Sequence, residues 1–122
     1  MTQAFYEGRV EEVISSYSFL HKTASVHLLE LEAYYKNVRK HIGIQSQIPI
    51  YFSPRLFLFY IRDNEGNKYW INYAALRSYQ CFQNRCLFIF LNGISLSILM
   101  TRVRFKRILT KIEKLIDYIN NI

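Results

Sequence analysis

The side chains that most often carry catalysis are sparse in this chain of 122 residues. None of its three histidines, His21, His27 and His41, has a Ser, Cys or acidic partner at the spacing of a known catalytic motif. The GxGxxG, P-loop, HExxH and GxSxG patterns are missing, and only four glycines are available for a phosphate-binding loop. The sequence therefore predicts a protein that is not an enzyme and that uses no cofactor.

Two cysteines could bind a metal or form a disulfide. Cys81 and Cys86 have the spacing C-x4-C, and the chain has no second cysteine pair to complete a zinc site. The spacing therefore predicts no metal centre. We expect two buried thiols, as is typical of a protein in a reducing compartment.

Positive charge is the strongest chemical signal. The net charge is +7, and residues 31–122 hold 14 Lys and Arg against five acids. Such an excess is typical of proteins that bind nucleic acid or an anionic surface, although many basic proteins bind neither. Cations recur at spacings of three and four residues near the C-terminus. The candidate DNA-binding residues are Arg102, Arg104, Arg107, Lys111, Lys114, Arg39, Lys40 and Arg77.

Four of these cations could contact one phosphate strand, and we call them the basic stripe: Arg104, Arg107, Lys111 and Lys114. Such contacts favour binding because each neutralised phosphate releases counterions. A solvated helix face without a partner is the alternative interpretation. The segment lacks the Asn and Gln side chains that usually read bases in the major groove. Backbone contacts or insertion into the minor groove are therefore the more natural mode.

Trp70 could stack on a base, but a Trp within an apolar strand is more often an anchor of the core, and we favour that role.

The basic stripe needs a helix to present it, and the sequence predicts one from Arg102 to about Tyr118. Thr101 can cap it. An apolar stripe of period 3.6 lies beside the basic one. Its members are Phe105, Ile108, Leu109, Ile112, Leu115, Ile116 and Ile119.

Four apolar-aromatic runs separated by turn signals precede this helix. Asn92-Gly93, between two such runs, is a strong hairpin signal. Residues 73–79 are ambiguous, because Ala74-Ala75 could form a helical turn. The expected strands are Ile48–Tyr51, Leu56–Ile61, Lys68–Ile71, Cys86–Leu91 and Ile94–Leu99.

The N-terminal third has weaker signals. Residues 1–7 are expected to be loose, and Arg9–Leu20 to form one or two strands. A helix is predicted to start at Thr23-Ala24-Ser25 with Ser25 as its cap, to run to about Lys40, and to stop at Gly43.

These elements predict a single domain over residues 1–122 of the α+β class. We expect an antiparallel sheet of about five or six strands, one helix near residues 25–40 and a basic amphipathic helix at about 102–119. The chain shows no apolar stretch long enough to span a membrane and no signal-peptide pattern, so we expect a cytoplasmic protein.

The order of these segments resembles the bacterial competence transcription factor ComK family. The similarity covers about 70 residues, from Ile48 to Ile116. The matching segments are IPIYFS (48–53), LFLFYI (56–61), YWINYAAL (69–76), CLFIFLNGISLSI (86–98) and TRVRFKRILTKIEKLI (101–116). The resemblance implies an activator that binds AT-rich double-stranded DNA in the minor groove as a homodimer or higher oligomer. It places a basic position of the family's final helix at Lys111, and implies a location on the nucleoid and possible regulatory protein partners.

Two alternatives remain open. The hairpin at 86–99, following Trp70-Ile71-Asn72, also resembles LytTR-type regulator domains, which bind DNA through loops of a β-fold. A protein–protein interaction module that docks on an acidic partner is the other.

Overall fold

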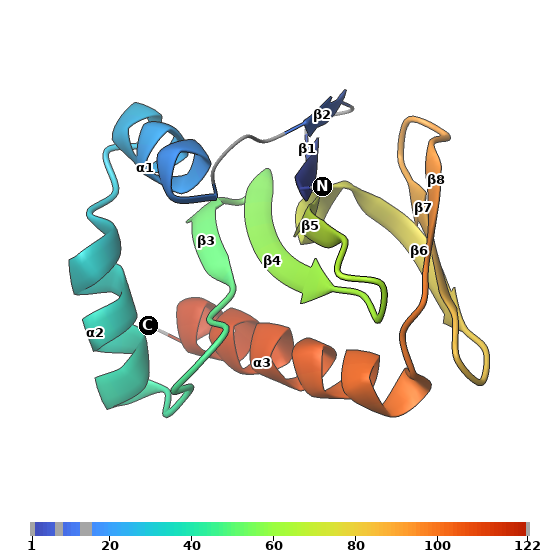
Figure 1. The fold of residues 1–122 in the computed structure, drawn as a ribbon. Coiled ribbons are helices and arrows are strands. Elements are labelled where there is room, and N and C mark those ends of the chain that lie inside the picture. The colour runs from blue at the N-terminus through green and yellow to red at the C-terminus, as the bar shows by residue number, and fades with distance from the viewer. Residues whose placement is uncertain (1, 7–8, 13–15, 122) are drawn as a thin grey trace.

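A five-stranded sheet lies at the centre of the computed structural model, with the strand order β2-β1-β5-β4-β3 (Figure 1). The structure describes residues 2–6, 9–12 and 16–121. Neighbouring strands are antiparallel except β1 and β5, which pair parallel. The strands are β1 (Thr2–Tyr6), β2 (Arg9–Glu12), β3 (Ile50–Ser53), β4 (Leu56–Arg62) and β5 (Lys68–Asn72).

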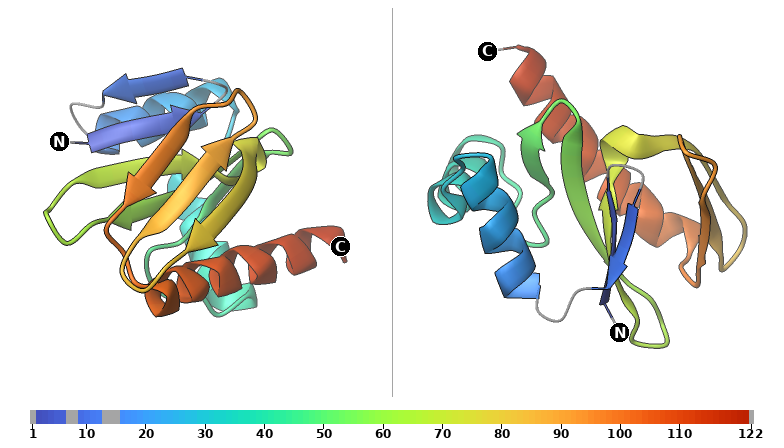
Figure 2. Two further views of the ribbon diagram at one scale, coloured as in Figure 1. Left: turned by 90° about the vertical axis from the view of Figure 1, so that its right-hand side faces the viewer. Right: turned by 90° about the horizontal axis from the view of Figure 1, so that it is seen from above.

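A second, three-stranded antiparallel sheet has the order β6-β7-β8. The large sheet is covered by α1 on one face, and by α3 and the second sheet on the other (Figure 2). The remaining elements are η1 (Tyr73–Ala75), β6 (Leu76–Cys81), β7 (Cys86–Phe90), β8 (Ser95–Ile98), α1 (Ser16–Val26), α2 (Leu31–His41) and α3 (Arg102–Asn120).

The residues of β4 show why the sheet is covered on both faces. Leu56 and Leu58 pack with Leu20 of α1, whereas Phe57 and Phe59 belong to the core that contains Phe105 of α3. Successive side chains of a strand point to opposite faces, so a nearly continuous apolar run must bury both. Here α1 and α3 provide the two covers.

Buried Asn72 connects the start of β4 to η1. Its Oδ1 accepts hydrogen bonds from the amides of Phe57 and Ala74, and its Nδ2 donates to the Arg55 carbonyl oxygen. The side chain thereby caps η1, the short turn that leads from β5 into β6. The polar atoms of this 1 % exposed residue therefore have partners.

The α+β class and the C-terminal helix are confirmed. The five strands expected from residue 48 onward are present as β3, β4, β5, β7 and β8 and pair antiparallel, although in two sheets. Residues 73–79 contain both a helical turn, η1, and the start of β6. The Thr101 hydroxyl caps α3 by accepting from the Arg104 amide, 3.2 Å away.

The predictions for the N-terminal third were wrong in several places. Thr2–Tyr6 forms β1 where loose chain was expected, and Glu7 lies outside the described residues. Arg9–Glu12 is a strand as expected, but Ser16–Leu20 begins α1. The single helix near 25–40 is two helices: Ser25 lies inside α1, and the Glu30 carboxylate caps α2 by accepting from the Glu32 and Ala33 amides. Gly43, at φ 84°, follows α2 as predicted.

The prediction of two buried thiols was also wrong. Cys81 and Cys86 face each other across the β6–β7 hairpin and form a disulfide. Directly paired residues in antiparallel strands place their Cβ atoms close enough for this bond, and their Cα atoms here are 4.1 Å apart. The spacing C-x4-C therefore reflects a four-residue hairpin loop.

We expect Tyr34→Phe to destabilise the fold by about 1–3 kcal/mol. The Tyr34 hydroxyl donates to the Pro49 carbonyl oxygen at 2.7 Å and accepts from the Tyr51 amide at 3.1 Å, and so ties α2 to β3. Removing it leaves two backbone groups without that partner. Urea denaturation at neutral pH measures the loss, and a change within error of zero would show that water replaces both bonds.

The same residue predicts a pH dependence. Burial raises the pKa of Tyr34 to about 12, so the folded state favours the neutral phenol. Its contribution is complete below about pH 10, the unfolded pKa, and is lost as the pH rises toward 12. Between about pH 10 and 12, the free energy of unfolding of the Phe variant should therefore fall less than that of the parent. Parallel curves of this free energy against pH would contradict the prediction.

Candidate nucleic-acid interface

The helix α3 presents the basic stripe on one flank of its buried face. Phe105, Ile112 and Leu115 point into the core, and Arg107 and Lys114 are exposed. Arg104 is partly buried and lies near Tyr60 of β4. Burial raises the pKa of the Tyr60 hydroxyl, and the nearby charges of Arg62 and Arg104 lower it in part. The stripe thus begins against the sheet and continues on the open surface.

Lys111 differs from the other members of the stripe. Its Nζ donates to the Ser46 carbonyl oxygen at 2.8 Å. Burial lowers the pKa of this ammonium group. Lys111 therefore fixes the segment between α2 and β3 against α3, and its charge is already partly engaged within the protein.

The end of α2 meets the same segment. Arg39 Nε donates to the Gln45 carbonyl oxygen at 3.4 Å, next to the carbonyl that accepts from Lys111. Two of the predicted cations, 72 positions apart in the chain, are thus bound to consecutive carbonyl groups. Lys40, the neighbour of Arg39, is exposed.

Two other candidates lie elsewhere. Exposed Arg77 belongs to β6 in the three-stranded sheet. Tyr79 of this strand contacts Phe105, with ring centroids 5.1 Å apart, and lies near Tyr73, which is itself close to Glu113. This is the acidic flank of α3, away from the basic stripe. Arg102, the first residue of α3, lies against the β6–β7 loop at Phe82–Asn84.

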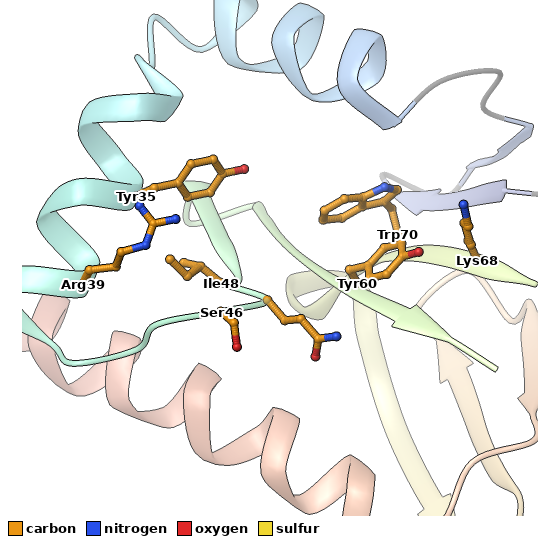
Figure 3. Close-up of a pocket in the computed structure, with 8 residues that line it drawn as sticks. Tyr35, Arg39, Ser46, Ile48, Tyr60, Lys68 and Trp70 are labelled. Atoms are coloured by element: carbon orange, nitrogen blue, oxygen red, sulfur yellow. The ribbon is translucent and has the colours of Figure 1, made fainter. Parts of the chain in front are cut away.

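A pocket of about 420 Å³ opens between α2, the segment before β3, and strands β4 and β5 (Figure 3). The sequence did not predict it as a site, since its walls come from segments joined only by tertiary packing. Its described lining residues are Tyr35, Arg39, Ser46, Gln47, Ile48, Tyr60, Lys68 and Trp70.

The expected role of Trp70 as an anchor of the core is confirmed. It is 7 % exposed and packs against Tyr60 and Phe19, at centroid distances of 5.1 and 6.5 Å. It belongs to the cluster that holds α1 on the sheet. The same residue also lines the pocket.

His27 and His41 lie near the ends of different helices. His27 Nδ1 lies 2.9 Å from the Thr23 carbonyl oxygen and its ring packs on Phe52, whereas His41 ends α2. Within the described ranges, no three His, Cys, Asp or Glu side chains gather closely enough to hold a metal ion. In the same part of the chain, none of the helices has the length and apolar character that crossing a membrane requires.

Comparison of this chain with protein-family models, with curated proteins and with solved structures gave no match.

Proposed function

We propose that this protein binds double-stranded DNA through the basic stripe of α3 and acts as a transcription regulator of the kind that the resemblance to ComK implies. The observation that carries the proposal is the meeting of the α2 end and the stripe at Gln45 and Ser46. In this proposal the shared segment holds the end of α2, with exposed Lys40, beside the stripe, so that cations of two helices face the same duplex.

The dimensions of the stripe suit a phosphate backbone. Arg104 and Lys114 are ten residues apart, which is about 15 Å along a helix axis. Successive phosphates of one strand are farther apart than their axial spacing of about 3.4 Å, because the strand winds around the duplex, so the stripe spans about two or three phosphates. In this proposal Arg107 and Lys114 make the main contacts, Arg104 and Lys40 flank them, and Lys111 mainly positions the loop.

The stripe contains only Arg and Lys, which neutralise phosphates and favour the negative potential of a narrow minor groove. We therefore propose that AT-rich duplexes are preferred. Activation, a homodimer and a place on the nucleoid are further parts of the proposal that rest on the resemblance alone.

Fluorescence anisotropy with an AT-rich and a GC-rich duplex of equal length, each at low and near-physiological salt, tests the proposal. We expect tighter binding to the AT-rich duplex and an affinity that falls steeply with salt. If the two duplexes bound equally and salt abolished the binding of both, the protein would have a basic surface without a preference for the minor groove of AT-rich DNA. No binding at low salt would contradict DNA binding and favour an acidic protein partner.

A further inference from the structure

The pocket between α2 and the β4–β5 strands has the chemistry of a nucleotide site, and it is separate from the exposed members of the basic stripe. We propose that it binds one nucleotide, with the base among the aromatic side chains and the phosphate on Arg39 or Lys68. Its volume, about 420 Å³, lies within the range of small-molecule sites in proteins.

Aromatic side chains line two sides of the pocket. Tyr35 projects from α2, and Tyr60 and Trp70 lie opposite on β4 and β5 (Figure 3). Trp70 is nearly buried, so the half-buried rings of Tyr35 and Tyr60 offer most of the accessible π-surface. A nucleobase can pack on such rings whatever its identity.

The same tyrosines offer hydroxyl donors. Burial raises the pKa of both Tyr35 and Tyr60. Their hydroxyl groups therefore stay neutral at physiological pH and can donate to a base or a phosphate.

Cations from opposite sides contribute to the pocket. The Arg39 guanidinium lies 5.9 Å from the centre of the Tyr35 ring and points from α2 toward the pocket, and exposed Lys68 lies on β5 (Figure 3). Lys68 pairs across the strands with Arg62, which adds to the positive potential. The eight described lining residues include no carboxylate. The site therefore favours an anion.

The third wall is held in an unusual conformation. Gln47 has φ 48°, in the left-handed region that non-glycine residues seldom adopt, and its neighbour Ser46 is fixed by Lys111. Such backbone strain is concentrated at ligand sites, where the surrounding structure maintains it. The Gln47 amide and the Ser46 hydroxyl can both donate and accept, as recognition of a base edge requires.

Trp70 is the only tryptophan of the chain and lines this pocket, so its fluorescence is a direct probe. We expect adenosine monophosphate to change it saturably, and adenosine or inorganic phosphate alone to bind at least about tenfold more weakly. A short single-stranded oligonucleotide, titrated in parallel, distinguishes a free nucleotide from one within a strand. If the oligonucleotide bound saturably and adenosine monophosphate did not, the site would be assigned to a nucleotide within a single-stranded nucleic acid.

The double substitution Arg39→Gln and Lys68→Gln should weaken binding of whichever ligand is bound by about tenfold or more. The double substitution Lys22→Gln and Lys36→Gln is the matched control, because it removes the same charge and both residues are exposed and do not line the pocket. Absence of a saturable change with either ligand, or an unchanged affinity in the double variant, would overturn the proposal. Binding of duplex DNA is measured on the same variants. This measurement distinguishes a failure of the nucleotide proposal from a failure of the proposal that the basic stripe binds DNA.

Discussion

Replacing Arg107 and Lys114 together with glutamate is expected to weaken duplex DNA binding by about 100-fold or more at near-physiological salt. Both side chains are exposed on the outer part of the basic stripe. Each reversal removes a cation from a phosphate and adds a repulsion. The slope of log affinity against log salt should also decrease by about 0.9 for each phosphate that the variant no longer neutralises.

The matched control is Lys22→Glu with Lys106→Glu. It changes the net charge by the same amount, and both residues are exposed, on α1 and on the acidic flank of α3. If binding depended only on total charge, the two double variants would lose affinity equally, and that outcome would contradict an interface at the stripe. We expect the control to lose less than about tenfold, through long-range electrostatics alone.

Lys111 is left intact in this experiment for a structural reason. Its ammonium group holds Ser46, so a reversal there would disturb the segment before β3 as well as the charge. A loss of binding by a Lys111 variant would therefore not identify a DNA contact. Arg107 and Lys114 are exposed, so substituting them changes the charge of the surface without disturbing the packing of the core.

The sequence predicted α3 well because every signal for it is local. A threonine cap, an apolar period of 3.6 and the neighbouring basic stripe lie within twenty residues and agree. The two turns that contain Gly66 and Gly93 were predicted for the same reason, since both glycines have positive φ there.

The break between α1 and α2 could not be predicted because it lacks the usual residue. The amides of Leu28 and Leu29 donate to the carbonyl oxygens of Ser25 and Ala24, which is the Schellman pattern that ends a helix. Glycine commonly occupies the left-handed position of that pattern, but here Leu28 adopts φ 56°. Packing of Leu20 and Leu31 on the sheet favours this turn, and no local signal marks it.

The candidate site also has parts that local sequence signals predict and parts that they do not. The charges of the basic stripe were predicted from helix periodicity, and their place on the flank of α3 follows from which residues are buried. The link between Lys111 and Ser46, 65 positions apart, and the pocket around Trp70 depend on long-range packing. A pattern of residue types carries no information on such pairings, so these features required the structure.

Phe105→Ala is expected to have the largest effect on stability, about 3–5 kcal/mol. The ring is 2 % exposed and connects α3 to both sheets. Its centroid lies 5.1 Å from Tyr79 on β6 and from Phe88 on β7, and 6.4 Å from Phe59 on β4. A cavity at this junction leaves three strands without the ring they pack on, so the neighbours cannot all close it.

Urea denaturation of Phe105→Ala, Phe105→Leu and Val103→Ala measures this contribution. We expect the Leu variant to lose about 1–2 kcal/mol, because it keeps most of the volume, and exposed Val103 to contribute less than about 0.5 kcal/mol. An Ala variant within about 1 kcal/mol of the parent would show that Phe105 does not join the sheets. Well below its midpoint of unfolding, the Ala variant should still bind DNA, whereas the Arg107 and Lys114 double variant should stay fully folded and fail to bind. These opposite results would distinguish Phe105, which holds α3 on the sheets, from Arg107 and Lys114, which contact DNA.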